Sequence, residues 1–259
     1  MQSRLEIASL VARLVCLAVM LSFLAGCSLA NLPFRLMPSP WQHVAPGLQV
    51  RVMLPRADAS SQLFVTRIDP ERYRFRAIYQ PGAAQSLAAW RAQEPDASLI
   101  VNANYFDAAR RAIGLVVSDG SAHGEAYRQL GGAFLVRNGE AAVVANHAGL
   151  RMRPSEQAVQ GYPLLVVNGK QAFTDTRGAE RNRRSVIAQD RQGRILIIIA
   201  PYLGPSLAQL SAFLAASDLD IVTAFNLDGG RSTMLALPDA EYMQPSFQAV
   251  PTILAVYKR

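Results

Sequence analysis

The 259-residue sequence is poor in the side chains that carry thiol and metal chemistry. It contains two cysteines and three histidines, and His43, His123 and His147 lie far apart along the chain. Two cysteines exclude a disulfide scaffold, and because they are not spaced as CxxC they exclude a zinc ribbon. The GxSxG elbow, the P-loop, the GxGxxG fingerprint and the HExxH motif are also absent. These absences argue against zinc hydrolases and serine-protease-like enzymes together.

Charged residues are scarce as well, and they are unbalanced. They make up 17% of the chain, with 26 Lys and Arg against 19 Asp and Glu, which gives a net charge of +7. A hydrophobic fraction of 51% excludes a disordered tail, and the length suits one large globular domain or two small ones. The basic excess indicates an anionic partner or surface.

Residues 1–26 are predicted to be a targeting segment. A polar start with two arginines precedes an uncharged apolar run at 14–24, which is too short for an ordinary transmembrane helix and matches the hydrophobic region of a signal peptide. The sequence Leu-Ala-Gly-Cys at 24–27 resembles the lipobox of bacterial lipoproteins, which implies cleavage before Cys27 and lipidation of its thiol. The alternative is a free cysteine in an uncleaved apolar anchor.

Lipidation attaches a protein to a membrane lastingly when one residue carries several acyl chains. Ser28 after the modified cysteine resembles the signal for sorting to the outer membrane, so we expect a lipid-anchored protein at the periplasmic face of a bacterial envelope. Residues 27–47, which contain four prolines, are the predicted tether, and residues 48–259 are the predicted folded domain.

The domain is predicted to be rich in β-strands, since apolar and polar residues alternate along much of it. Candidate strands lie at 48–54, 62–68, 72–76, 97–103, 221–227 and 252–257. Turns at 138–139 and 168–169, both Asn-Gly, and at 190–193 predict three hairpins.

One strand and two helices stand out within this pattern. The run at 195–199 has no polar face, so we expect a central strand covered on both sides. Short helices are predicted at 86–93 and 207–216, the second with Ser206 as its N-cap. No repeat or linker divides residues 48–259, so we predict a single α+β domain that is dominated by sheet, with a few short helices packed on a mixed β-sheet.

Arg72, Arg74 and Arg76 form a basic stripe on one face of a predicted strand. The stripe suits either an anionic polymer or, as we prefer, a solvated face, with the aromatic residues between the arginines turned to the core. The arginines do not form a recognisable nucleic-acid binding module, so no nucleic-acid partner is expected.

Polar clusters at the ends of apolar strands are the candidates for chemistry. Asn102 and Asn104 point to the same face in strand geometry, and Asp107 follows them closely. Amides suit sugar hydroxyls or phosphoryl oxygens, because they donate and accept hydrogen bonds without imposing charge. The alternative is an Asx-rich turn at the end of a strand.

Two further clusters contain glycines and arginines. The polar residues and glycines of the second cluster are Asn226, Asp228, Gly229, Gly230 and Ser232. The glycines allow the backbone to approach a ligand closely, and the polar residues that follow can donate to an anion, but Asp-Gly-Gly is also an ordinary turn. The third cluster, at 181–184, has three arginines before a strand and suits either bidentate bonds to phosphate or a basic loop.

Taken in order, these clusters resemble the phosphodiester glycosidase family. The matching segments are 102–107, 114–120, 132–134, 160–169, 184–187 and 226–233. They extend over about 98–257, and the ordered series is more specific than any one motif. The chain departs from the family pattern at Ala188, where Gly is usual, and at 161–163, where Tyr162 separates the usual Gly-Pro pair.

The resemblance implies hydrolysis of a sugar-1-phosphodiester, with release of a sugar and a phosphomonoester. The implied substrate is like a GlcNAc-1-phosphodiester or is a phosphate-bearing exopolysaccharide or envelope glycan. Because phosphate leaves as a weak base, donors around it matter more than a strong general acid. Carried onto this chain, the resemblance assigns Asp228 as base or nucleophile, Asp107 as the second carboxylate and Arg184 as the phosphate clamp. The substrate contacts that it assigns are Asn102, Asn104, Asn226, Gly229, Gly230 and Ser232.

No cofactor is expected. Oxygen atoms of Asp107, Asp228 and the asparagines leave a divalent cation open, although no loop has EF-hand spacing. The expected partners are an anionic glycan and, through Cys27, a membrane. Two other functions stay open: a non-catalytic lipoprotein that binds anionic envelope glycan, and an ordinary glycosidase that acts on a neutral exopolysaccharide.

Overall fold

The computed structural model describes residues 38–55, 59–146, 155–177 and 179–259. The predicted signal segment and Cys27 lie outside the described residues. Within the described ranges, no helix combines the length and the apolar character that crossing a membrane requires.

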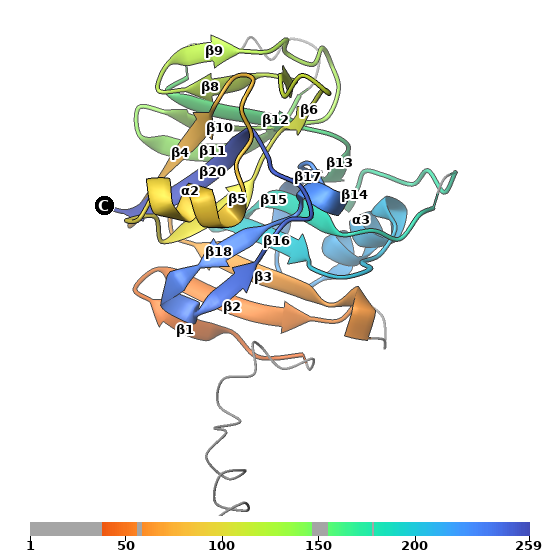
Figure 1. Ribbon diagram of the computed structural model, residues 1–259. Coiled ribbons are helices and arrows are strands. Elements are labelled where there is room, and N and C mark those ends of the chain that lie inside the picture. The colour runs from red at the N-terminus through yellow and green to blue at the C-terminus, as the bar shows by residue number, and fades with distance from the viewer. Residues whose placement is uncertain (1–37, 56–58, 147–154, 178) are drawn as a thin grey trace, which may run out of the picture. The chain divides into compact units, whose positions relative to one another are not determined.

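The largest sheet has eight strands in the order β1-β2-β3-β16-β15-β17-β13-β14 (Figure 1). Its strands are β1 (Gln42–Ala45), β2 (Leu48–Met53), β3 (Leu63–Ile68), β13 (Leu164–Val167), β14 (Lys170–Gln171), β15 (Arg184–Asp190), β16 (Ile195–Ala200) and β17 (Ile221–Asn226). The strand predicted to be central is β16, the fourth of the eight, and all of its residues are buried. That prediction is confirmed.

Two five-stranded sheets and a two-stranded pair complete the fold. One sheet, in the order β19-β18-β5-β20-β4, contains β4 (Tyr73–Tyr79), β5 (Leu99–Asn102), β18 (Leu235–Leu237), β19 (Tyr242–Gln244) and β20 (Thr252–Lys258). The other, in the order β11-β10-β12-β8-β9, contains β8 (Val116–Ser118), β9 (Ser121–His123), β10 (Gly132–Arg137), β11 (Glu140–Ala145) and β12 (Gln157–Gly161). The pair is β6 (Tyr105–Phe106) with β7 (Ala112–Ile113).

The dominance of sheet is confirmed, but the prediction of a mixed sheet is wrong. Every strand pairing among the described residues is antiparallel, including both pairings of β15, with β16 and with β17. The chain passes through a helix between β16 and β17. However, β15 lies between these two strands, so the strands that the helix connects never pair with each other.

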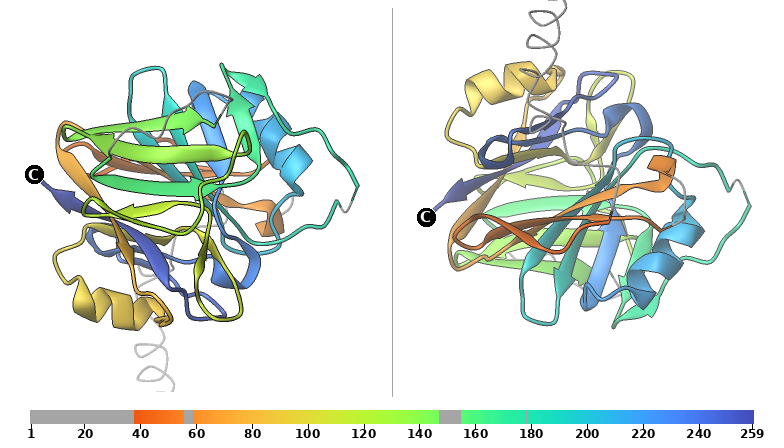
Figure 2. Two further views of the ribbon diagram at one scale, coloured as in Figure 1. Left: turned by 90° about the horizontal axis from the view of Figure 1, so that it is seen from above. Right: turned by 90° about the horizontal axis from the view of Figure 1, so that it is seen from below.

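Among the described residues, two short α-helices lie on opposite sides of the sheets (Figures 1 and 2). Helix α3 (Leu207–Ala216) begins with a capping box, in which the side chains and backbones of Ser206 and Gln209 bond reciprocally. Its buried Leu210 and Leu214 pack in the core cluster that covers the eight-stranded sheet. Helix α2 (Leu87–Gln93) buries Trp90 on the sheet that contains β5.

The predicted Asn-Gly hairpins form as expected. Asn138 and Gly139 have φ values of 49° and 75°, and Asn168 and Gly169 have 51° and 74°. Two consecutive residues with positive φ define the turn whose twist matches that of the flanking strands. They connect β10 to β11 and β13 to β14.

Aromatic contacts hold the three large sheets together. Phe64 of β3 stacks on Tyr242 of β19, with ring centroids 4.1 Å apart. Phe75 of β4 meets Phe134 of β10 at 5.3 Å. The three sheets therefore pack against one another, and the site described below lies where they converge.

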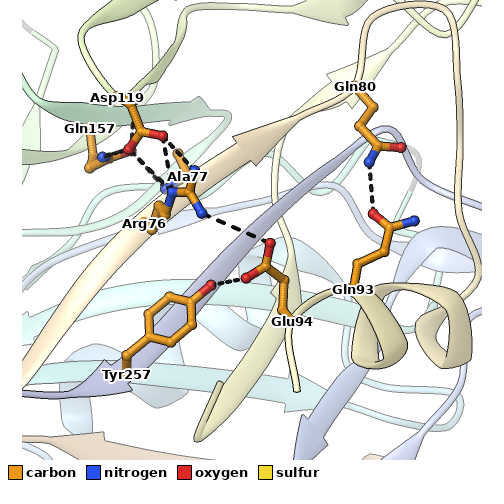
Figure 3. A network of polar contacts seen from close by, with 8 residues as sticks. All are labelled: Arg76, Ala77, Gln80, Gln93, Glu94, Asp119, Gln157 and Tyr257. Atoms are coloured by element: carbon orange, nitrogen blue, oxygen red, sulfur yellow. Dashed lines mark hydrogen bonds and ion pairs between the residues drawn. The ribbon is translucent and has the colours of Figure 1, made fainter. Parts of the chain in front are cut away.

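The basic stripe takes part in a polar network at the surface (Figure 3). Arg76 forms an ion pair with Asp119 at 2.6 Å, and Gln157 donates to the same carboxylate over 2.7 Å. Arg76 also lies 3.9 Å from Glu94, which accepts a hydrogen bond from the Tyr257 hydroxyl at 2.6 Å. The network links β4, β8, β12, β20 and the end of α2, so Arg76 is committed to structural contacts.

The predicted tether becomes part of the fold before Leu48. Gln42–Ala45 forms β1 and pairs with β2, and the amide of Ser39 donates to the carbonyl of Val52 over 3.1 Å. The arginine side chain of Arg67 covers the Trp41 ring at 3.8 Å. The last part of the 27–47 segment is therefore an edge strand and its approach rather than a free linker.

Candidate active site

Asp228 lies where β17 ends beside the start of β15. Val186 is opposite Asn226 in the antiparallel register, and the Gly230 amide donates to the Arg183 carbonyl over 2.8 Å. The segment after β17, which carries Asp228, therefore runs alongside the segment that carries Arg183 and Arg184. The structure thus brings together two clusters that lie more than forty positions apart in the sequence.

The Asp228 carboxyl group is largely buried. Its Oδ1 accepts a hydrogen bond from the Gly229 amide at 2.9 Å, and the buried Ser232 hydroxyl also bonds to it. Burial raises the pKa of Asp228 to about 6, because these two hydrogen bonds only partly offset the cost of placing a charge there. The group therefore changes charge close to neutral pH, which is the property required of a general base or acid.

Asn102 joins the end of β5 to the Asp228 loop. Its Nδ2 donates to the Asp228 carbonyl over 2.6 Å, and its Oδ1 accepts from the Ser185 hydroxyl at 2.8 Å and from the Met234 amide at 3.1 Å. The Asp228 amide in turn donates to the Ala103 carbonyl over 2.9 Å. Asn102 is fully buried, so it holds the loop in place from behind.

Asn226 and Tyr105 form a second link at the same point. The Asn226 Nδ2 donates to the Tyr105 hydroxyl over 2.6 Å, and this hydroxyl donates to the Tyr162 carbonyl over 2.8 Å. Burial, and then the negative charge of Asp228, raise the pKa of Tyr105. The positive charge of the Arg184 guanidinium has the opposite effect and lowers the pKa of Tyr105. The Tyr105 hydroxyl thus lies within the electrostatic reach of both Asp228 and Arg184.

Asn104 connects the site to the sheet that contains β8 and β12. It is almost fully buried, and its Nδ2 donates to the Leu115 carbonyl over 3.0 Å. The neighbouring Gln160 accepts from the amides of Leu115 and Tyr127, both at 2.9 Å. Burial raises the pKa of Tyr127, and the charge of Asp228 adds to this effect. Tyr127 therefore belongs to the surroundings of the Asp228 carboxyl group.

The two arginines at the start of β15 carry charge without a carboxylate partner among the described residues. Arg184 donates to the carbonyls of Glu180 at 2.8 Å and Pro205 at 3.4 Å. Arg183 is buried, donates to the carbonyls of Thr233 and Pro245, and lies 4.3 Å from the Phe247 ring. Burial lowers the pKa of both arginines. The carbonyl oxygens accept these hydrogen bonds without neutralising the charges, and the Glu180 carboxylate acts on Arg184 only through a Coulombic effect that raises its pKa, so the Arg184 guanidinium can still bind an anion.

The two glycines of the Asp228 loop allow a close approach between backbones. A Cβ atom on Gly229 would lie 3.0 Å from the Arg183 carbonyl oxygen. Gly230 has φ +58°, in the left-handed region that favours glycine. This close approach brings the loop that carries Asp228 against the segment that carries Arg183 and Arg184.

Asp107 is separate from this cluster. Its carboxylate accepts from the backbone amide of Arg111 at 2.9 Å and from its Nε at 2.8 Å. These bonds hold the pKa of Asp107 below its usual value. Among the described residues, no hydrogen bond or ion pair joins Asp107 to Asp228. Asp107 instead lines a cavity beside the site, together with Tyr127.

Sequence reasoning missed the two tyrosines of the site. Tyr105 could have been found from the sequence, because it lies inside the segment 102–107, between the two amides and the carboxylate. No pattern around Tyr127 marks it, because it reaches the site through the fold of the 114–128 segment. Among the described residues, no cluster of three or more His, Cys, Asp or Glu side chains could hold a metal ion.

Asp228, whose pKa burial raises to about 6, lies on the segment that runs beside the start of β15, and a carboxyl group with such a shifted pKa is typical of hydrolase sites that use general acid or base catalysis. The family comparison agrees with this class. A model of the phosphodiester glycosidase family matches residues 95–257, which is more than half of the chain. The chain therefore belongs to the phosphodiester glycosidase family, and the resemblance noted from its motifs is confirmed.

Solved structures give the same result for the fold. The catalytic domain of zebrafish N-acetylglucosamine-1-phosphodiester alpha-N-acetylglucosaminidase, auto-inhibited by its pro-peptide, is similar with a TM-score of 0.63 and 18% identity, over 86% of this chain and 87% of that one. A Synechocystis protein gives a TM-score of 0.58 and 17% identity, over 85% of this chain and 64% of that one. An exported protein of Burkholderia pseudomallei gives 0.57 and 12%, over 80% and 74%. A comparison with curated proteins finds no match.

Proposed function

We propose that this protein hydrolyses a sugar-1-phosphodiester, breaking the bond between the sugar C1 and the phosphate oxygen. The substrate is like a GlcNAc-1-phosphodiester or is a phosphate-bearing exopolysaccharide or envelope glycan. The observation that carries the proposal is the register of β15 and β17, which brings the segment that carries Asp228, with its pKa of about 6, beside the start of β15, where Arg184 donates to carbonyls. Membership of the phosphodiester glycosidase family supports the same reaction.

Asp228 acts as base or nucleophile in this proposal. Either role uses the ionised carboxylate, which predominates above pH 6 because burial sets the pKa of Asp228 at about 6. The Gly229 amide at 2.9 Å and the Ser232 hydroxyl fix the orientation of the carboxylate. A fixed orientation lowers the entropy cost of reaching the anomeric carbon.

Arg184 binds the phosphate. Its guanidinium is held by two carbonyls, so its position is set before the substrate arrives and its charge stays available. The positive charge stabilises the phosphomonoester as the C1–O bond breaks, and this effect is larger in a site from which water is largely excluded. A strong general acid is then not required, since the leaving group is already a weak base.

The three asparagines act through the protein rather than by direct contact. Asn102, Asn104 and Asn226 are at most 2% exposed, and their amide groups donate to protein oxygens. We assign them to positioning: Asn102 holds the Asp228 backbone, and Asn226 holds the Tyr105 hydroxyl. Tyr105 takes the place of a direct substrate contact, because its hydroxyl lies within the electrostatic reach of both Asp228 and Arg184.

The proposal includes the cellular location. The Leu-Ala-Gly-Cys sequence at 24–27 and the apolar run before it support lipidation of Cys27 and anchoring at the periplasmic face of the outer membrane. The net charge of +7 suits an anionic envelope glycan there. Labelling of the full chain with a radioactive fatty acid, compared with Cys27→Ser, tests the anchor, and label in both proteins would refute it.

Product analysis on defined substrates tests the reaction. Full-length protein in detergent is incubated with a GlcNAc-1-phosphodiester and, separately, with a neutral GlcNAc glycoside. We expect free GlcNAc from the phosphodiester only, and a large loss of this activity in Arg184→Ala. Equal turnover of both substrates, unchanged in Arg184→Ala, would instead identify an ordinary glycosidase. Saturable binding by calorimetry without any product would identify a non-catalytic glycan-binding lipoprotein.

A further inference from the structure

A cavity of about 790 Å³ lies beside the candidate active site. Its wall is formed by the end of β4, by β7, by β9 and by the segment that follows β9. The volume falls within the range of ligand sites in proteins. None of the roles assigned to Asp228 and Arg184 uses this cavity.

Tyr127 connects the cavity to the site. It lines the cavity, while the Asp228 charge contributes to the raised pKa of its hydroxyl. Its backbone is fixed at both ends, since its amide donates to Gln160 and its carbonyl accepts from Asn146. Geometry supports the same link, because Asn104 of the site donates to the Leu115 carbonyl over 3.0 Å, next to Gly114 of the cavity wall. A molecule in the cavity would therefore lie close to a substrate bound at Asp228.

Two tightly packed glycines line the cavity. Gly114, with φ +84°, is packed so closely that a Cβ atom would lie 2.9 Å from the Tyr127 ring. A Cβ atom on Gly124, with φ +71°, would lie 2.3 Å from the Gly114 carbonyl oxygen. Side chains are excluded at both positions, so no side chain of residue 114 or 124 fills this part of the cavity.

The chemistry of the lining fits an uncharged sugar. Tyr79 and His123 meet edge to face, with centroids 5.1 Å apart, and Ile113 is 43% exposed, which provides apolar surface for the C–H face of a sugar ring. Asp107 and Arg111 are joined at 2.8 Å and present planar polar groups for hydroxyls. The other two charged residues of the lining, Glu125 and Arg128, also have opposite charges. The cavity therefore has no excess charge that would attract an anion.

We propose that this cavity is a subsite for a second, uncharged sugar unit, joined to the sugar whose C1–O bond is cleaved. The protein then acts on an oligosaccharide or polymer rather than on an isolated sugar phosphate. This inference rests on the proposed function for its link to catalysis. It also gives Asp107 a role that agrees with its place in the structure, namely binding of sugar hydroxyls.

The test compares two substrates that differ by one sugar. Full-length protein is assayed on a GlcNAc-1-phosphodiester and on the disaccharide GlcNAc-GlcNAc-1-phosphodiester. We expect kcat/KM to be at least about tenfold higher for the disaccharide. His123→Ala and Ile113→Ala each remove this advantage and leave the single-sugar rate within about twofold. The matched control is His43→Ala, an exposed histidine on β1, which keeps the advantage.

Equal rates on the two substrates, or equal losses on both in the cavity variants, would overturn the subsite while leaving the proposed reaction intact. Binding separates the remaining cases. The phosphate-free disaccharide GlcNAc-GlcNAc is titrated into the protein and into His123→Ala by NMR. Binding that His123→Ala abolishes, without turnover of either substrate, would support the subsite and refute the reaction. Neither binding nor turnover would overturn both.

Discussion

Replacing Asp228 by asparagine is expected to make the protein more stable at neutral pH. The carboxyl group is buried, and its pKa rises from 3.8 to about 6. The unfolded chain keeps the lower value, so between pH 3.8 and 6 the folded state holds a proton that the unfolded state has lost. Stability therefore falls as the pH rises through this range, and the full penalty applies above about pH 6.

The size of the penalty follows from the pKa change. At about 1.4 kcal/mol for each pH unit, a rise of about 2 units costs about 3 kcal/mol. Asparagine has nearly the same shape, and its Oδ1 can still accept from the Gly229 amide, but it carries no charge. We expect Asp228→Asn to exceed the wild type by up to about 3 kcal/mol at pH 7.5 and to match it near pH 3.5.

Urea unfolding at the two pH values measures this difference. Asp96→Asn is the matched control, because Asp96 is exposed, and its substitution should change stability little at either pH. A difference between Asp228→Asn and the wild type that is the same at pH 3.5 and pH 7.5 would refute the reasoning. So would a variant that is less stable than the wild type at pH 7.5.

Three further outcomes are expected. Arg184→Ala lowers kcat/KM on a sugar phosphodiester about 100-fold, while Arg184→Lys recovers part of the loss, as measured by steady-state kinetics. Asn102→Ala leaves the buried Asp228 carbonyl and Met234 amide without partners and destabilises the fold by about 3 kcal/mol in urea unfolding. The kcat/KM profile falls tenfold per pH unit below about pH 6, because the ionised form of Asp228 is lost as its carboxyl group, with a pKa of about 6, takes up a proton. A profile that is flat from pH 4.5 to 7.5 would contradict the role of Asp228.

Much of the local structure could be predicted because neighbouring residues determine it. The turns at Asn138 and Asn168 depend on two residues each that tolerate positive φ. The start of α3 depends on Ser206 and the residues just after it. The central place of β16 follows from a run that has no polar face.

The pairing and relative direction of the strands could not be predicted from neighbouring residues in the same way. A period of two shows which face of a strand is buried, but it does not show which neighbour the strand pairs with. In the sequence, β15 and β16 precede α3 and β17 follows it, yet in the sheet β15 lies between β16 and β17. That choice depends on packing across the whole sheet, which alternation along one segment does not record.

The candidate site shows the same division. The register of β15 and β17 places the segments that carry Asp228 and Arg184 side by side, which the order of the motifs in the sequence does not reveal. Asn102 spends all three of its hydrogen bonds on the protein, and the sequence does not distinguish a buried amide from an exposed one. Asp107 has its charge neutralised by Arg111, four residues away, in a turn that strand geometry did not predict.

Hydrolysis in water enriched in ¹⁸O tests the central claim most directly. Full-length protein is incubated with a GlcNAc-1-phosphodiester, and the released phosphomonoester is analysed by mass spectrometry. Cleavage of the C1–O bond at Asp228 predicts a phosphomonoester that carries no ¹⁸O, and loss of nearly all turnover in folded Asp228→Asn. A phosphomonoester that contains ¹⁸O, or turnover that persists in Asp228→Asn, would contradict the account.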